Sequence, residues 1–332
     1  MKIGLYMATQ WPNGADLTHE VDNLCEQARA AKEAGFASIF VGQHFLSEPL
    51  KMIQAEPLIA RLAAEADGLE FGIAVVLLAM QNPVMVAEYA ASLDWITGGR
   101  YILGVGVGYR PEEFEGLGVP FEDRASRFEE AVPLIRRLWT EDSITHHGTH
   151  FDVGGLGASI RPKRPGGPPI WIGGDIPPAV RRAARLGSPW VAPPTMHFDD
   201  VVHRLDVYRS SMVEAGTNHN QGQPLIREVA IGLSRQAAMS SARPALLAKY
   251  ESYAGWGQHS ASKGLNLAER FDEFCADRFV IGDEAEVFDE IQRYTDSFGV
   301  NHLLVRLQWP GFSQSATLDA IKRVGRVAAR LV

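Results

Sequence analysis

The sequence contains few cysteines, no excess of basic residues and no long hydrophobic run. Only Cys25 and Cys275 occur among the 332 residues. Two cysteines cannot form a disulfide framework, and no CxxC spacing indicates a zinc site. Lys and Arg number 32 against 40 Asp and Glu, a formal net charge of −8, whereas a protein that binds a nucleic acid backbone needs a basic face. We therefore expect buried free thiols, no metal centre and no nucleic acid partner.

Membrane-spanning and exported segments are also lacking. No apolar stretch approaches the ~18 residues that a transmembrane helix needs. The N-terminal residues MKIGLYMATQW carry one lysine and a short apolar run, without the long hydrophobic region of a signal peptide. Hydrophobic residues make up 46% of the chain, which excludes a disordered protein. We expect a cytoplasmic globular protein with no membrane contact.

Short apolar runs alternate with amphipathic segments along the chain. The runs cover residues 2–7, 38–42, 71–78, 101–108, 169–173, 190–192, 228–234 and 302–307. They show little polar alternation, which is typical of parallel strands buried on both faces. Helical spacing marks residues 18–35, 57–66, 84–96, 124–139, 178–186, 199–215, 243–256, 284–298 and 315–331. This alternation predicts an α/β fold of the (β/α)8 TIM-barrel class.

An open doubly wound sheet is the alternative fold. Such a sheet usually carries a glycine-rich phosphate-binding turn after its first strand. Here the first predicted strand is followed by ATQWP (residues 8–12), which has no such turn. The barrel is therefore favoured.

Two connections are longer than an ordinary barrel loop. Residues 111–168 contain a helical pattern and then a hairpin pattern that turns at Gly148, and residues 256–277 are polar and glycine-containing. Long insertions in compact domains are often lids or binding loops. We interpret both as insertions at the C-terminal face of the strands, and we expect residues 256–277 to become protected when ligands bind.

The active site of a barrel lies at the carboxyl ends of its strands. The residues that follow the predicted strands are mostly apolar or aromatic, and they offer no set of carboxylates and histidines for a metal. A flat organic cofactor fits this composition better. Glycines at 104, 106 and 108 lie within a strand, so they do not form a dinucleotide fingerprint; they serve either tight packing or the close approach of a planar ligand.

Gly173, Gly174 and Asp175 end one predicted strand just before a helix. Free backbone amides at a helix N-terminus favour an anion. The alternative is an ordinary strand–helix turn. His146, His147 and His150 flank the predicted hairpin turn without a carboxylate cluster, so we do not interpret them as metal ligands.

Several segments together resemble the bacterial luciferase-like family of flavin-dependent monooxygenases, which also contains enzymes that use the deazaflavin F420. The segments are VGQHF (41–45), GRYILGVG (99–106), EF (113–114), GVP (118–120), RxxRxxE (124–130), PIWIGG (169–174) and AAxxG (183–187). Their order and spacing carry the resemblance, and it covers most of the chain.

The resemblance implies a single luciferase-like barrel domain over residues 1–332 that binds FMN or F420 at the strand ends. It favours a two-component monooxygenase, in which a separate flavin reductase supplies reduced FMN and O2 is used on a small organic substrate. The alternatives are an F420-dependent dehydrogenase or reductase that transfers hydride without O2, and a flavin-binding protein without turnover.

The resemblance also implies roles for individual residues. The Ala74–Val75 position matches a non-prolyl cis peptide beside the ring, and Arg124 matches the phosphate region. The full set of cofactor-binding positions is Ala74, Val75, Gly106, Gly108, Tyr109, Arg124, Gly173, Gly174 and Asp175. Gln43, Phe45 and Ile176 depart from the family pattern, which commonly has Glu, His and a hydroxyl residue there.

His44 is the candidate catalytic residue, since it matches a histidine near the reactive ring. An unperturbed histidine has a pKa near 6.5, which suits proton transfer. A hydrogen-bonded structural histidine is the alternative. Glu48 is the carboxylate near it in sequence. The candidate substrate pocket comprises Met7, Gln10, Trp11, Gln43 and Trp309, although the two tryptophans would also suit a closed core.

The helical segments 57–66 and 84–96 are rich in alanine. Small residues allow helices to approach closely, and symmetric dimers are the commonest oligomers. We therefore expect a homodimer through this side of the barrel, with packing onto the barrel itself as the alternative.

Overall fold

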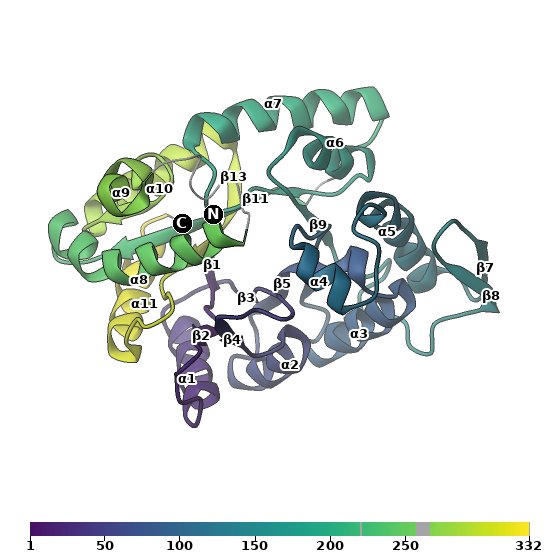
Figure 1. Cartoon of the computed structure of the whole chain (residues 1–332), viewed down its shortest axis with the longest axis horizontal. Coiled ribbons are helices and arrows are strands. Elements are labelled where there is room, and N and C mark those ends of the chain that lie inside the picture. The colour runs from purple at the N-terminus through teal and green to yellow at the C-terminus, as the bar shows by residue number, and fades with distance from the viewer. Residues whose placement is uncertain (220, 257–265, 332) are drawn as a thin grey trace.

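A curled sheet of parallel strands forms the centre of the computed structural model, which describes residues 1–219, 221–256 and 266–331 (Figure 1). The nine strands are ordered β10-β9-β6-β5-β3-β1-β13-β11-β12. Their bounds are β1 Lys2–Tyr6, β3 Ser38–Val41, β5 Glu70–Leu77, β6 Tyr101–Gly106, β9 Ile170–Gly173, β10 Trp190–Val191, β11 Gln223–Ile231, β12 Val280–Gly282 and β13 Val300–Arg306. All eight apolar runs of the sequence contribute to this sheet.

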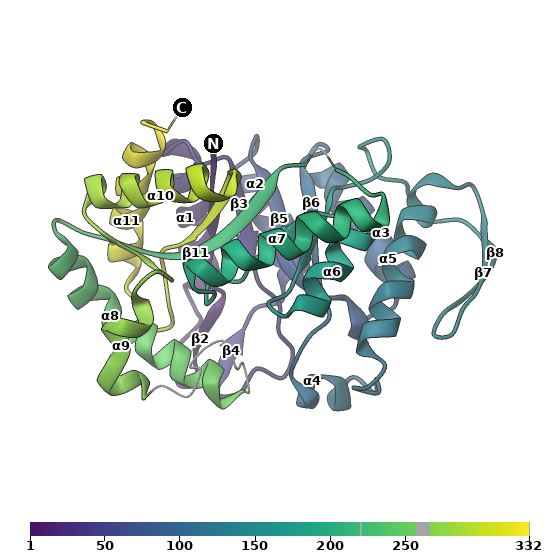
Figure 2. The same cartoon turned by 90° about the horizontal axis from the view of Figure 1, so that it is seen from above.

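Helices cover the outside of the sheet (Figures 1 and 2). They are α1 Glu20–Glu33, α2 Ala55–Glu65, α3 Pro83–Ile96, α4 Pro111–Gly116, α5 Arg124–Thr140, α6 Pro177–Arg185, α7 Phe198–Ala215, α8 Arg235–Gly255, α9 Leu267–Cys275, α10 Glu284–Phe298 and α11 Gln314–Ala328, with a short 3-10 turn at Leu78–Met80. None of the helices in the described ranges is long and apolar enough to cross a bilayer.

Local sequence explains where these elements begin and end. Strand β3 is wholly buried, as expected for an apolar run between two layers. Helix α10 begins at a capping box in which Asp283 and Glu286 satisfy backbone amides reciprocally, and it ends at Gly299 in the left-handed conformation. The strand-to-helix alternation thus follows from apolar runs and caps that the sequence makes visible.

Between β10 and β11 the sheet has one parallel bridge, from Ala192 to Leu225. The other neighbouring strands of the sheet are joined by ladders of parallel pairs. The structure therefore confirms an α/β fold with a curled parallel sheet, and closure into a complete eight-stranded barrel stays a prediction.

Three features differ from the sequence-based expectation. Strand β11 begins at Gln223 rather than at residue 228, so Glu228 lies inside the strand. Strand β12 was not predicted. The short strands β2 (Gln10–Pro12) and β4 (Leu50–Met52), which pair antiparallel in a separate two-stranded sheet, were not predicted either. Polar or short runs of this kind give weak periodicity, because only a few residues are involved.

The two predicted insertions have different outcomes. Within residues 111–168, β7 (Ile144–His147) and β8 (Asp152–Leu156) form the expected hairpin, which projects beside α5 (Figure 1). Within residues 256–277, the stretch 267–275 is helix α9, and residues 257–265 lie outside the described residues. Ligand-dependent protection of this segment stays a prediction. Cys25 and Cys275 are buried and unbonded, as expected.

Candidate active site

A cavity of about 800 Å³ opens at the carboxyl ends of the strands. This volume lies within the range of small-molecule and cofactor sites. Most of the positions predicted from the sequence line it: Met7, Gln10, Gln43, His44, Ala74, Val75, Gly106, Gly108, Tyr109, Arg124, Gly173, Gly174 and Asp175. Residues that are far apart in the chain are thus brought together by the common direction of the parallel strands.

Trp11 and Trp309 do not line this cavity, contrary to the expectation that they wall a substrate pocket. Both are buried in apolar clusters. The indole Nε1 of Trp309 donates to Glu228 Oε2 at 2.6 Å. A tryptophan at a strand end can point outward into the helix layer as well as inward, and here packing took both rings into the core.

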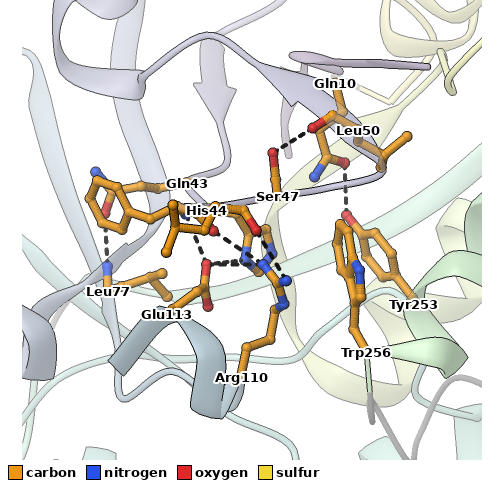
Figure 3. A network of polar contacts seen from close by, with 12 residues as sticks. Gln10, Gln43, His44, Ser47, Leu50, Leu77, Arg110, Glu113, Tyr253 and Trp256 are labelled. Carbon is orange, nitrogen blue, oxygen red and sulfur yellow. Dashed lines mark hydrogen bonds and ion pairs between the residues drawn. The ribbon is translucent and has the colours of Figure 1, made fainter. Parts of the chain in front are cut away.

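His44 is held by Glu113, as Figure 3 shows. The imidazole Nδ1 lies 3.0 Å from Glu113 Oε1, and the same oxygen accepts the backbone N–H of Phe45 at 2.8 Å. Glu113 is fully buried, on the short helix α4. The carboxylate fixes the ring orientation. Nε2 makes no hydrogen bond to a described residue, so it is the nitrogen that can act on a ligand.

Arg110 supplies the positive charge beside this carboxylate. Its Nη1 lies 3.6 Å from Glu113 Oε1, and its guanidinium also donates to the carbonyl oxygens of Phe45 and Leu46. Because a buried carboxylate needs a cationic or hydrogen-bonding partner, Arg110 and His44 together account for the burial of Glu113. Glu48, the carboxylate near His44 in sequence, is not the partner of the imidazole; its backbone oxygen accepts a hydrogen bond from Trp256 Nε1 at 3.1 Å.

Aromatic rings surround the imidazole. Tyr109, Tyr253 and Trp256 lie with ring centroids 6.0, 6.4 and 5.6 Å from that of His44. The Tyr109 hydroxyl is buried without a hydrogen-bond partner among the described residues, and burial raises the pKa of this phenol. An unpaired hydroxyl at a cavity wall is a ready donor for a ligand oxygen or nitrogen.

Gln43 and Gln10 are held mainly by the protein. Gln43 Oε1 accepts from the backbone N–H of Leu77 and from Gln81, while its Nε2 donates to Glu56. Gln43 therefore braces the ends of β3 and β5. Gln10 accepts a hydrogen bond from Tyr253, and its Nε2 has no partner in the described part of the chain.

Val75 forms one wall of the cavity, and two glycines make room for it. The Ala74–Val75 peptide is cis, as the family resemblance implies. A Cβ at Gly106 would lie 2.6 Å from Val75 Cγ2, and one at Gly173 would lie 2.9 Å from Val75 Cγ1. These glycines therefore let the isopropyl group stand over β6 and β9, where it offers an apolar surface to a flat ring.

Two arginines, Arg124 and Arg182, also line the cavity. Arg124 donates from Nη1 to the Phe121 oxygen at 2.7 Å and makes no other hydrogen bond to a described residue. Arg182 donates from Nε to Glu129 Oε1 at 2.7 Å. The remaining guanidinium N–H groups of the two side chains suit a phosphate.

Sequence reasoning assigned no site role to several charged residues of the site. They are Arg110, Glu113, Arg182, Glu228, Lys249 and Arg306. Glu228 and Arg306 each interrupt an otherwise apolar strand, which was a usable signal. Lys249 lies on a helix, where a charged residue is normally solvated, so no signal marked it. Glu113 stands in the EF segment (113–114) that carries the family resemblance, but no sequence pattern paired it with His44.

Some sequence-predicted candidates lie elsewhere. His146 pairs with Glu130, His147 with Asp152, and His150 with Ser126. Across residues 1–219, 221–256 and 266–331, no three His, Cys, Asp or Glu side chains gather as a metal site would require. The groups that are present fit a flat ring with a terminal phosphate: an apolar wall at Val75, unpaired donors at Tyr109 and Gln10, and two arginines.

A comparison with protein families decides the relationship. The profile of the luciferase-like monooxygenases matches residues 1–302. The chain belongs to this family. Its members include enzymes with different activities. An F420-dependent glucose-6-phosphate dehydrogenase of Intrasporangium calvum is 28% identical over 318 residues, covering 89% of this chain and 91% of that protein. The 4-hydroxyprotoasukamycin monooxygenase of Streptomyces nodosus subsp. asukaensis is 28% identical over 351 residues, covering 100% and 91%.

A luciferase-like fold is also seen in solved structures. The oxygenating constituent of 3,6-diketocamphane monooxygenase from Pseudomonas putida, solved with FMN, superposes with a TM-score of 0.82 at 19% identity, over 100% of this chain and 99% of that one. At this identity the likeness concerns the fold. Family membership supports an oxidoreductase. The relatives include an F420-dependent dehydrogenase and a monooxygenase, and the solved diketocamphane enzyme contains FMN.

Proposed function

We propose that this luciferase-like protein is a two-component monooxygenase, which uses reduced FMN and O2 on a small organic substrate. The observation that carries the proposal is the His44–Glu113 pair at an apolar cavity that also contains two arginines. When bound, reduced FMN would supply the two electrons with which one oxygen atom of O2 enters the substrate and the other leaves as water.

The residues of the chain bind, orient and move a proton. Arg124 and Arg182 hold the phosphate, and Val75 supports the ring. His44 transfers a proton between its Nε2 and the reacting groups, while Glu113 fixes the orientation of the imidazole. Apolar walls exclude water, which a reaction with activated oxygen requires.

The preference for FMN over F420 rests on charge. The terminal phosphate monoester of FMN carries close to two negative charges, and two arginines match it. The phosphate of F420 is a diester with one charge. We also propose that a separate reductase supplies reduced flavin, since the sequence contains no dinucleotide fingerprint.

Anaerobic titration with FMN, reduced FMN and F420, followed by turnover with and without O2, tests this function. We expect reduced FMN to bind most tightly and substrate oxidation to require O2. Tight binding of F420 with hydride transfer in the absence of O2 would instead establish the dehydrogenase alternative. Binding of flavin with no turnover on any substrate class would support the non-catalytic reading.

Arg124→Ala is expected to weaken the binding of reduced FMN by ~1.5–3 kcal/mol, the usual value of a hydrogen bond to a charged group. At saturating cofactor, kcat should change little, because Arg124 acts on the phosphate. Fluorescence titration and steady-state kinetics measure the two quantities. Arg326→Ala on α11, whose side chain is exposed, is the matched control. Intact affinity with a collapsed kcat would contradict the phosphate role.

We propose a homodimer through α3. Most alanines of α2 and α3 are buried within the chain, so they serve packing onto the sheet. Met85, Tyr89 and Ile96 are instead 52%, 48% and 55% exposed and share one face of α3. A helix face this apolar favours a partner surface.

Met85→Glu combined with Tyr89→Glu should convert a dimer to a monomer, because the new charges would be buried at the interface. Light scattering at micromolar concentration gives the mass. Val213→Glu, at an exposed apolar position of α7, is the control. A monomeric mass for the unsubstituted protein would reject the dimer.

A further inference from the structure

A buried group of charges forms part of the cavity wall. Glu228 of β11 binds Lys249 of α8, and both side chains are almost inaccessible, 0% and 2% exposed. Arg306 at the end of β13 lies 3.4 Å from the same carboxylate oxygen and is 11% exposed. Lys249 and Arg306 line the cavity. We call Glu228, Lys249 and Arg306 the charge cluster.

The hydrogen-bonding capacity of Glu228 is fully used. Oε1 accepts from Lys249, from Arg306 and from the Tyr250 hydroxyl at 2.7 Å, and Oε2 accepts from Trp309. The attraction of the two cations outweighs burial and lowers the pKa of this carboxyl. Glu228 is therefore an anion that its neighbours already saturate.

Among the residues that the structure describes, the charge cluster has two cations and one carboxylate, a surplus of one positive charge. The other titratable groups of these residues that act on the two cations are Tyr6, Tyr250 and Tyr253. Burial raises the pKa of each phenol, to about 12 for Tyr253, so none supplies a negative charge near neutral pH. A buried charge without a counter-charge is strongly unfavourable.

The surplus positive charge affects the pKa of Lys249. Burial and the nearby Arg306 lower its pKa to about 7. Arg306 keeps its proton, because Glu228 raises its pKa despite burial. The Nε of Arg306 has no partner in the part of the chain that the structure describes. Both cations thus have capacity for another anion.

The position of the charge cluster separates it from the arginines at α5 and α6. Val75 lies on β5, and three strands (β3, β1 and β13) separate β5 from β11 in the curled sheet. Both strands contribute residues to the same cavity. The Arg306 guanidinium lies 4.2 Å from the centroid of the Tyr6 ring, and the Tyr6 hydroxyl donates to the carbonyl oxygen of Ala74 at 2.6 Å. A substrate that lies next to a ring supported by Val75 can therefore reach the charge cluster.

We propose that Lys249 and Arg306 bind an ionised carboxylate of the substrate, so that the protein acts on small organic acids. One surplus positive charge matches one monovalent anion. Aromatic and apolar side chains beside the charge cluster, Tyr6, Tyr253 and Ile226, accept the remainder of such a molecule. This inference rests on the proposed function for the statement that the bound acid is a substrate.

Isosteric probes test the charge preference. Calorimetry measures the affinity of the cofactor-loaded protein for three acids of increasing size: acetate, benzoate and 2-naphthoate. The neutral amide of each acid is titrated in parallel, so that acid and amide differ in charge but hardly in size or shape. At pH 6.5 we expect the best-bound acid to bind at least tenfold more tightly than its amide. The preference should decrease at pH 8.5, because Lys249 then loses its proton.

Lys249→Met is the decisive variant. It leaves Glu228 paired with Arg306, a neutral pair, so the fold should be retained. The acid preference should fall below threefold while amide binding stays within twofold. Tyr250→Phe removes a neutral donor to Glu228 without changing the charge, and Lys322→Met removes an exposed lysine; both should keep the preference.

Three results would overturn the inference. They are equal affinities for acid and amide in every pair, no acid bound at 50 mM, and an acid preference that survives Lys249→Met. Loss of reduced-FMN affinity in Lys249→Met with no change in the acid preference would assign the charge cluster to the cofactor. Titration of the cofactor-free protein separates the two proposals, because acid preference without any flavin binding would contradict the proposed function alone.

Discussion

His44→Ala is expected to lower kcat by ~10²–10⁴-fold, the usual loss when a positioned proton donor or acceptor is removed. The cofactor affinity and the fold should be preserved, since the imidazole contacts the protein mainly through Glu113 and ring edges. Neighbouring side chains cannot replace it: Gln43 does not titrate near neutral pH, and the Tyr109 phenol has a raised pKa. Stopped-flow and steady-state kinetics measure the loss.

The fraction of consumed O2 that is released as hydrogen peroxide gives a second measure. It should increase in His44→Ala, because protons are no longer delivered to the productive reaction. His44→Gln retains a hydrogen-bonding group for Glu113 without an imidazole, and it should lose activity to a similar extent while keeping the thermal stability. Unchanged kcat and unchanged peroxide release in both variants would make His44 a structural residue.

Glu228→Ala is expected to destabilise the protein by ~3–5 kcal/mol, which is typical when one partner of a buried ion pair is removed. The alanine leaves Lys249 and Arg306 facing each other without a carboxylate, and it removes the acceptor of Trp309. The free energy of unfolding in urea measures the effect. Tyr250→Phe is the control, since it removes one hydrogen bond and no charge, and it should lose ~0.5–1.5 kcal/mol.

The pH dependence of stability offers an independent check of the same feature. Lys249 has a folded pKa near 7 and an unfolded value of 10.5, so the unfolded chain binds more protons between these values. Burial of Lys249 therefore lowers the free energy of unfolding most below pH 7. This penalty decreases as the pH rises from 7 towards 10.5, so the stability rises over that range. Lys249→Met should remove this rise over pH 7–9.5. A loss below 1 kcal/mol in Glu228→Ala, or an unaltered pH dependence in Lys249→Met, would contradict the buried surplus charge.

The fold was largely predictable because its signal is local. Buried parallel strands are apolar throughout, and caps such as Asp283 and Gly299 mark helix ends within a few residues of sequence. Strand β11 was placed too late because Arg227, which is fully buried like its neighbour Glu228, looks like a turn residue in front of the apolar run. Their burial depends on partners that are distant in sequence, and no local pattern contains that information.

The candidate site was predictable only in part, for a similar reason. Strand-end residues such as His44 and Val75 were found because parallel strands end on one side of a sheet. The partner of His44 was not: Glu113 is 69 positions away, on a helix. The direction in which a tryptophan side chain points at a strand end is also decided by packing, which the sequence does not show. Trp309 was therefore assigned to the pocket, although it lies in the core.

The arrangement of Val75, Gly106 and Gly173 restricts the order in which substitutions can be introduced into this wall of the cavity. Alanine at either glycine would overlap the isopropyl group of Val75, and a branched side chain has no flexible end that could move aside. Val75→Ala therefore has to come before Gly106→Ala or Gly173→Ala, and the reverse order passes through a strained protein. The three positions behave as one unit in directed evolution, and libraries that randomise them singly would miss the combinations that the wall can accept.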